Sequence, residues 1–234
     1  MFSSANIFSE FRELITYIGS RDILMRPKQF HDESFLFREN VWKLENIFWV
    51  KKAFFLAQCQ SSVIVSITEN NLDDLIYADA CFSQLQGISL NIVVADCVPI
   101  LLYDSKKQII WAVHAGWRGS SEKILQKTLR AMQDLHRSDM KDIFLCIWPC
   151  ISQKNYEVGE ELVKYFPEDV IFVSEEKYYL DLRAENLRQA QELWILTQHI
   201  EVSDECTFEL SEKYFSYRRE KCKANFVCGI GMEI

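Results

Sequence analysis

The chain has 234 residues, of which 49% are hydrophobic and 26% are charged, and it contains 7 glycines and 4 prolines. This composition is typical of a folded globular protein and excludes collagen-like, low-complexity and disordered chains. The formal net charge is −8 and there is no basic block, which argues against nucleic acid or an anionic membrane as a partner.

The eight cysteines form no CxxC pair, and several lie in apolar runs. A chain of this length needs no disulfide framework, so we expect mostly reduced core thiols. Charged side chains interrupt residues 1–19, which predicts no signal peptide, and no apolar run reaches the length of a membrane span. These features together predict a cytoplasmic protein.

In chain order, residues 21–40 are polar and weakly patterned, and predict a long loop rather than a domain boundary. Apolar and β-branched runs then predict strands at 62–67, 88–94, 98–103, 108–113, 143–148, 171–173 and 226–230. Apolar periodicity predicts helices at about 121–136, 156–166 and 183–196, the first capped by Ser120 or Ser121. Several runs of strands with helices between them favour an α+β or mixed α/β domain with more than one sheet layer.

Two polar clusters stand at the ends of predicted strands: Ala95–Pro99, which contains Cys97, and His114–Gly119. A four-residue connection joins the strands at 98–103 and 108–113 into a hairpin, so Cys97 and His114 could converge. A thiol and an imidazole that meet are either two metal ligands or a nucleophile and its base. The alternative is a buried cysteine beside a hydrogen-bonded histidine.

The second candidate is an anion site at Gly116-Trp117-Arg118-Gly119, just before a predicted helix. A turn of this kind presents backbone N–H groups, and a guanidinium fits phosphate oxygens. The paired arginines at 218 and 219 are a second candidate contact for an anion. An exposed arginine on a tight turn is the alternative in both places.

Ala95-Asp96-Cys97-Val98-Pro99, followed after a short hairpin by His114-Ala115-Gly116-Trp117-Arg118-Gly119, closely resembles the core of the laccase-domain family. That family was long called multicopper polyphenol oxidases and is now regarded as zinc-containing purine nucleoside phosphorylases. Further segments resemble it: Asp79-Ala80, Gly87, Pro149-Cys150-Ile151, Tyr156-Glu157-Val158-Gly159, Asp181-Leu182, Asn186, Gln189, Cys206-Thr207 and Phe215-Ser216-Tyr217-Arg218-Arg219. The resemblance covers roughly residues 58–219, and it implies a single α+β domain over residues 1–234, with layered mixed sheets flanked by helices in an α/β/β/α-like arrangement.

The resemblance also implies a zinc ion held by two histidines and a cysteine. Cys97 and His114 match two of these ligands, whereas the third position is Gln60, whose carboxamide is a poorer zinc ligand than imidazole. The adjacent Cys59 would point to the opposite face of a strand.

The activity that the resemblance implies is phosphorolysis of adenosine, inosine or methylthioadenosine, with adenosine deamination as a side activity. Cys97, His114 and Arg118 are then the catalytic residues, and Gly116 belongs to the loop whose amides bind phosphate. We expect Arg21 and Arg218 to help hold the anion. Trp117 or Tyr217 is the candidate to stack on the purine.

Three alternatives remain from the sequence. The first is a metal-free hydrolase that uses the Cys97 thiol and His114 as its base. The second is a non-catalytic descendant that binds a nucleotide or a partner, which the change at Gln60 favours. The third, copper-dependent oxidation of polyphenols, needs clustered histidines, whereas the four in this chain are scattered.

Overall fold

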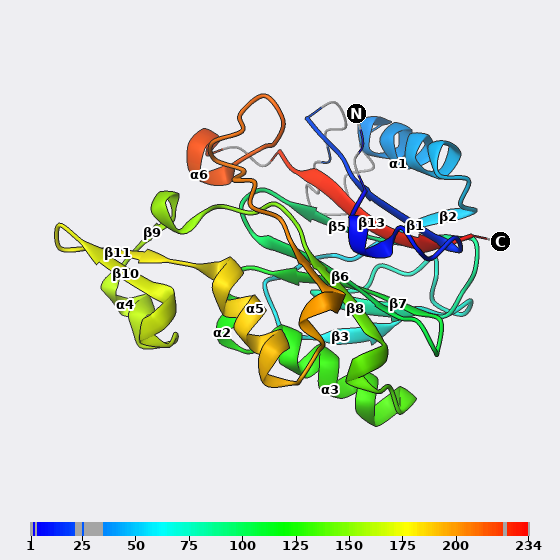
Figure 1. The fold of residues 1–234 in the computed structure, drawn as a ribbon. Helices are drawn as coiled ribbons and strands as arrows, with labels where there is room; N and C mark the ends of the chain where they lie inside the picture. The colour runs from blue at the N-terminus through cyan, green and yellow to red at the C-terminus, as the bar shows by residue number, and fades with distance from the viewer. Residues whose placement is uncertain (1, 3, 22–24, 26–34, 222–223, 234) are drawn as a thin grey trace.

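Two β-sheets stacked face to face form the centre of the molecule (Figure 1). The structure is a computed structural model that describes residues 2, 4–21, 25, 35–221 and 224–233, so most of the loop predicted at 21–40, and Cys222, lie outside the described residues. The four-stranded sheet has the order β1 (Leu14–Ile18), β13 (Phe226–Met232), β5 (Ile88–Val94) and β2 (Lys52–Phe55). The six-stranded sheet has the order β12 (Ile200–Val202), β8 (Ile143–Ile147), β6 (Val98–Asp104), β7 (Ile109–Ala115), β4 (Ala80–Ser83) and β3 (Ile64–Ser66).

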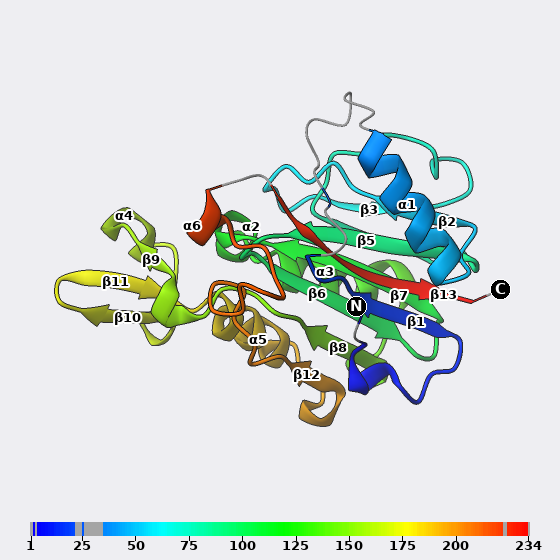
Figure 2. The same ribbon diagram turned by 90° about the horizontal axis from the view of Figure 1, so that it is seen from above.

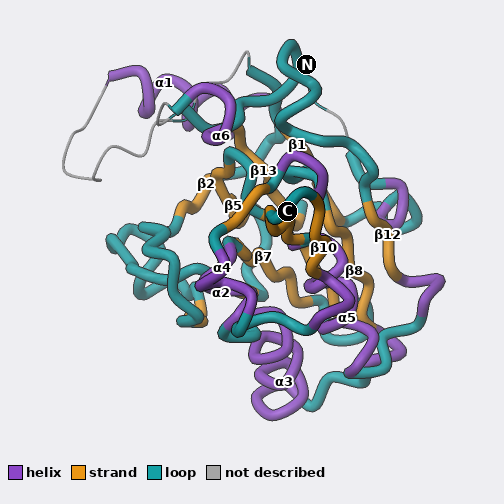
Figure 3. Tube along the Cα trace, turned by 90° about the vertical axis from the view of Figure 1, so that its left-hand side faces the viewer, coloured by secondary structure: helices purple, strands orange, loops and turns teal. Residues whose placement is uncertain are grey.

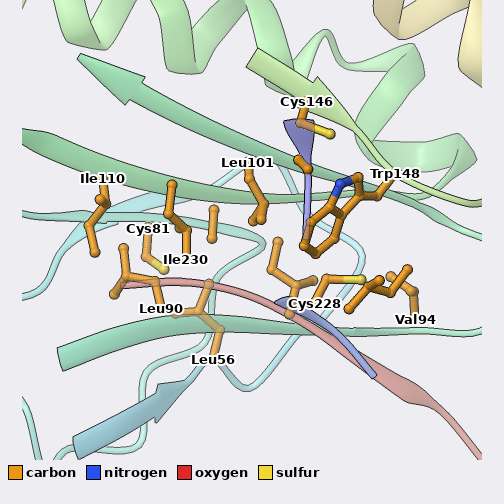
Figure 4. Close-up of a cluster of buried hydrophobic side chains, with 14 of the residues drawn as sticks. Leu56, Cys81, Leu90, Val94, Leu101, Ile110, Cys146, Trp148, Cys228 and Ile230 are labelled. Carbon is orange, nitrogen blue, oxygen red and sulfur yellow. The ribbon is translucent and has the colours of Figure 1, made fainter. Parts of the chain in front are cut away.

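The main hydrophobic core fills the space between these two sheets (Figure 4). Side chains of β5, such as Leu90, meet side chains of β6 and β7, such as Leu101 and Ile110, and all three are fully buried. Seven-residue strands that are buried along their whole length are mostly apolar in sequence, which is why the sequence revealed β5, β6 and β7. Their buried polar residues are Ser89, Asn91, Asp104 and His114. Five cysteines are buried, as expected of core thiols: Cys81, Cys146, Cys150, Cys206 and Cys228.

Helices cover the outer faces of both sheets. The helices are α1 (Phe35–Ile47), α2 (Trp117–Ser121), α3 (Ile124–His136), α4 (Glu160–Val163), α5 (Leu182–Glu192) and α6 (Tyr217–Glu220). One apolar cluster joins α3 and α5 to the six-stranded sheet, another joins α1 to the four-stranded sheet, and α1 and α3 lie on opposite sides of the molecule (Figure 3). This arrangement confirms the predicted α+β domain with an α/β/β/α order of layers. No helix in the described part of the chain is long and apolar enough to cross a membrane.

A small third sheet projects from one side of the molecule (Figure 2). It has the order β10 (Ile171–Ser174), β11 (Lys177–Leu180) and β9 (Glu157–Val158). The helix predicted at 156–166 is therefore wrong over most of its length, because Glu157 and Val158 pair with β11 and only Glu160–Val163 is helical. Apolar spacing over a few residues could not distinguish these two outcomes.

The predicted helix at 121–136 is confirmed as α3 over residues 124–136, and a separate short helix, α2, precedes it. The helical conformation is interrupted at Lys123, whose φ of 60° lies in the left-handed region. The first helix begins at Trp117, with Gly116 at its N-cap and no side-chain cap, so the predicted capping by Ser120 or Ser121 is wrong. Ser120 is instead buried, where its hydroxyl accepts a hydrogen bond from Asn186 Nδ2 at 2.9 Å.

Candidate active site

A cavity of about 1100 Å³ opens where the two central sheets end. Ligand pockets usually measure roughly 300–1,000 Å³, so this space can hold a nucleoside together with an anion. Seven of the predicted site residues line it: Gln60, Cys97, His114, Trp117, Arg118, Tyr217 and Arg218. A second hollow of about 410 Å³, between the N-terminal segment and the end of α1, contains none of them.

Cys97 and His114 are brought together by the β6–β7 hairpin. In its antiparallel register Val98 pairs with Ala115, so Cys97 sits just outside the strand pair, beside the end that carries His114. The Cys97 sulfur is close enough to raise the pKa of the imidazole. The predicted convergence is therefore confirmed.

Asp79, which the sequence analysis gave no role, orients His114. Its carboxylate is completely buried, and Oδ1 lies 2.7 Å from Nδ1 of the equally buried imidazole. Burial alone would lower the pKa of His114, but the charges of Cys97 and Asp79 and their hydrogen bonds outweigh it and raise the pKa to about 10. Burial would raise the pKa of Asp79, but the hydrogen bonds from His114 and Ser61 lower it to about 2. One ring nitrogen is thus fixed by Asp79, and the other is left for Cys97 and the cavity.

The same carboxylate shapes the loop that carries Gln60. The backbone N–H groups of Cys59, Gln60 and Ser61 all donate to Asp79, at 3.2, 3.2 and 2.6 Å. Gln60 takes a φ of 61°, so the segment is a tight loop and not the strand that the sequence analysis assumed. Gln60 lines the cavity, while the thiol of Cys59 turns to Asp79 Oδ2 at 3.5 Å, outside the cavity.

Gly116 lies in close contact with the side chains of Gln60 and Cys97. A Cβ on Gly116 would collide with Oε1 of Gln60 and would lie 3.1 Å from Sγ of Cys97. A side chain at position 116 would therefore displace the Gln60 carboxamide from its place beside Cys97 at the cavity wall.

Two guanidinium groups face the cavity. That of Arg118 lies 4.2 Å from the ring centroid of Trp117, and among the described residues no oxygen accepts a hydrogen bond from it. That of Arg218 lies 5.1 Å from the ring centroid of Tyr156 and donates to the backbone oxygen of Glu157 at 2.8 Å. In a chain with a net charge of −8 the cavity is a local basic site.

Asp96 anchors the second of these arginines, and the sequence analysis missed this as well. Its Oδ1 accepts from the hydroxyl of Thr207 at 2.7 Å, and its Oδ2 accepts from the backbone N–H of Arg218 at 2.6 Å. Asp96 has a φ of 90°, a conformation that costs energy for any residue but glycine and is concentrated at functional sites. This bond joins the segment before β6 to α6, and both of its residues line the cavity.

Comparison with known proteins shows the family of the chain. A family model described as multi-copper polyphenol oxidoreductase laccase matches residues 27–232. The chain belongs to this laccase family. Its relatives include purine nucleoside phosphorylases of Clostridium acetobutylicum, 33% identical over 78% of this chain and 77% of the relative, and of Campylobacter jejuni, 36% identical over 76% of each. A purine nucleoside phosphorylase of Bacteroides thetaiotaomicron is 35% identical over 60% of this chain, a match that spans 55% of the relative's length.

Two solved structures share the fold of this chain. The YfiH protein of Bacillus licheniformis superposes with a TM-score of 0.88 at 22% identity, covering 96% of this chain and 94% of that one. YlmD of Geobacillus stearothermophilus superposes with a TM-score of 0.87 at 22% identity, covering 98% and 94%. The α+β architecture is thus shared with these two proteins.

Arg21 does not belong to the cavity, which corrects the expectation that it helps to bind phosphate. Its Nη1 donates to the backbone oxygens of Ser211 at 3.0 Å and Tyr214 at 3.3 Å, and it pairs with Glu220. The guanidinium also lies 4.4 Å from the ring centroid of Phe215. Arg21 therefore ties the N-terminal part of the chain to the segment before α6.

The zinc that the family resemblance implies requires three donors, and the structure brings the three corresponding side chains together. They are Cys97, His114 and Gln60, but the described residues contain no group of three His, Cys, Asp or Glu side chains that could hold a metal. A neutral carboxamide oxygen suits magnesium or calcium better than zinc. This donor set does not fit the zinc site of the family.

Proposed function

We propose that the chain is a purine nucleoside phosphorylase, a glycosyl transferase that cleaves adenosine, inosine or methylthioadenosine with inorganic phosphate. The observation that carries the proposal is the cavity, where the Arg118 guanidinium faces the same space as aromatic rings and the Cys97–His114 pair. The names of the relatives from C. acetobutylicum and C. jejuni support the same reaction.

In this reaction a phosphate oxygen forms a bond to C1′ of the ribose, the bond from C1′ to the purine nitrogen breaks, and the purine takes up a proton. The anion has to be held against C1′, a role for Arg118 with help from Arg218 and the backbone amides after Gly116. The purine needs a flat apolar surface, which Trp117 or Tyr217 supplies at the cavity wall.

His114 is the group that can supply the proton. Because its pKa is raised to about 10, the ring is protonated at neutral pH, and Nδ1 is occupied by Asp79. The other nitrogen faces Cys97 and the cavity, and transfer of its proton to the departing purine neutralises the charge that develops there. No step of this scheme needs a metal ion.

The test is phosphate-dependent release of adenine from adenosine. Charge-assisted hydrogen bonds contribute about 1.5–3 kcal/mol, so Arg118→Ala should raise KM for phosphate on the order of 10- to 100-fold. His114→Ala should abolish turnover. Adenine release that does not need phosphate, or equal rates in wild type and His114→Ala, would overturn the proposal. Formation of inosine in the same reaction measures the proposed deaminase side activity.

The arrangement Asp79–His114–Cys97 favours one second candidate, a thiol hydrolase. Asp79 orients the imidazole, which in turn faces a thiol, as in nucleophile–base–carboxylate triads. The Cys97 sulfur would attack an acyl carbon, expel the leaving group and be released by water. Incubation with activated esters followed by mass spectrometry tests it: an acyl group on Cys97 that is lost in His114→Ala supports hydrolysis, and unmodified Cys97 rejects it.

A further inference from the structure

The third position of the zinc site that the laccase family resemblance implies is filled in this chain by a residue that is held in place but has unsuitable chemistry. The Gln60 backbone is fixed by Asp79, and its Oε1 and Cys97 Sγ both border the position where a Cβ of Gly116 would stand. The side chain at position 60 therefore still reaches the Cys97–His114 pair. What has changed is the donor atom.

Zinc sites in enzymes use three protein ligands drawn from thiolate, imidazole and carboxylate, and leave the fourth position open. Here two such ligands remain, and the third is an uncharged oxygen. Loss of an outer hydrogen-bonding partner of a ligand already costs about 10- to 100-fold in metal affinity, so loss of a ligand itself costs more.

The described residues offer no replacement for the missing imidazole. Cys59, the neighbour of Gln60, directs its thiol to Asp79 and away from the cavity. Asp79 itself is completely buried, and both of its oxygens already accept hydrogen bonds from the loop and from His114. His136 and His199 pack against aromatic rings elsewhere in the fold. The imidazole of His199 stacks on the ring of Phe144, with 3.9 Å between the two ring centroids.

We infer that this chain carries no resident zinc ion at Cys97 and His114, and that Gln60 is the residue responsible. The Gln60 carboxamide has no hydrogen-bond partner among the described residues, so it faces the cavity as a free donor and acceptor. The Cys97 thiol then has no bound metal, and it can react with a molecule in the cavity.

Zinc content is the direct test. Wild-type protein, purified without chelators, is equilibrated with zinc chloride, freed of unbound metal by gel filtration and analysed by elemental mass spectrometry. We expect far less than one zinc per chain. Gln60→His restores the imidazole and should bind one zinc per chain at least ~100-fold more tightly in competition with a chromophoric chelator.

Two variants control this comparison. Ser62→His adds an imidazole to the same loop, but Ser62 does not line the cavity, so the variant should bind no more zinc than wild type. Adding Cys97→Ser to Gln60→His should remove the zinc again. Wild-type protein that keeps one zinc per chain, and loses it on Cys97→Ser, would overturn the inference.

Thiol labelling gives a second readout. Iodoacetamide followed by peptide mass spectrometry measures alkylation of Cys97 alone, which matters in a chain with eight cysteines. Zinc should leave the rate unchanged in wild type and suppress it in Gln60→His. If Gln60→His does not fold, the zinc content and the thiol labelling of the wild-type protein still show whether zinc is bound at Cys97 and His114. Neither readout requires turnover, so a failure of phosphorolysis and a failure of this inference are separate results.

Discussion

Replacement of Asp79 by asparagine is the most informative single change in the candidate site. Oδ1 of Asp79 accepts from the backbone N–H of Gln60 and from His114, and Oδ2 accepts from Cys59 and from both the N–H and the hydroxyl of Ser61. Asn has the same shape but only one accepting atom. Whichever oxygen becomes the amide nitrogen, at least two buried or half-buried donors lose their acceptor.

The magnitude follows from this count. A hydrogen bond to a charged group contributes about 1.5–3 kcal/mol, so two lost bonds lower the free energy of unfolding by about 3–6 kcal/mol. For a domain of this size the melting temperature should fall by on the order of 10 °C. Asp73→Asn is the matched control, because the Asp73 carboxylate is 88% exposed and, among the described residues, pairs only with Lys52, an exposed ion pair worth about 0–1 kcal/mol.

The same substitution should also change how the free energy of unfolding depends on pH. The pKa of His114 is raised from 6.5 to about 10, so its stabilising contribution is complete below pH 6.5 and declines as the pH rises toward 10. The pKa of Asp79 is lowered from 3.8 to about 2, so its contribution is complete above pH 3.8 and is lost as the pH falls through 2. Between pH 6.5 and 10 the free energy of unfolding should therefore fall less steeply in Asp79→Asn, where only Cys97 still raises the pKa of the imidazole.

Urea denaturation followed by tryptophan fluorescence, repeated across this pH range, measures both effects. A loss below about 1 kcal/mol at pH 7, the range of an ordinary surface substitution, would refute the hydrogen-bond accounting. Equal pH slopes in wild type and variant would refute the pairing of Asp79 with His114.

Two further predictions concern close packing and the corrected arginine. Gly116→Ala should lower both stability and turnover, because the added Cβ collides with the Gln60 side chain. Adding Gln60→Ala to this variant should recover at least about 1 kcal/mol of the free energy of unfolding, which a double-mutant cycle in urea measures. Independent effects of the two substitutions would contradict this clash. Arg21→Ala should cost about 1–3 kcal/mol of stability, since Ser211 and Glu220 lose a charged donor, and leave KM for phosphate unchanged. A raised KM for phosphate would return Arg21 to the site.

The sequence predicted those parts of the site that depend on local order. The bounds Ile88–Val94 of β5 were predicted without error, because the strand is buried along its whole length and is apolar except at Ser89 and Asn91. The meeting of Cys97 and His114 followed from a single hairpin, whose register is fixed by its short connection. In both cases the pattern that carries the prediction lies within one short stretch of the sequence, although the ladder partners of β5 are the distant strands β13 and β2.

The parts that could not be predicted depend on contacts between distant residues. Asp79 lies 35 positions from His114, and the two partners of Asp96 lie 111 and 122 positions away. A charged residue directly before a fully buried strand, as Asp79 stands before β4, is the one signal that the sequence offered. Arg21 was misassigned for the same reason, since its partner Glu220 is 199 positions away.

Asp79 also explains how the side chain at position 60 can change while the site keeps its shape. The loop is held through the backbone N–H groups of residues 59, 60 and 61, and none of these bonds depends on which side chain position 60 carries. Gly116 leaves room beside that side chain, and His114 is oriented from the far side of its ring. A histidine at position 60 would thus meet the same Cys97 and His114 that glutamine meets now. Any difference in zinc binding between wild type and Gln60→His therefore reports the chemistry of one donor atom and not a rearrangement of the cavity.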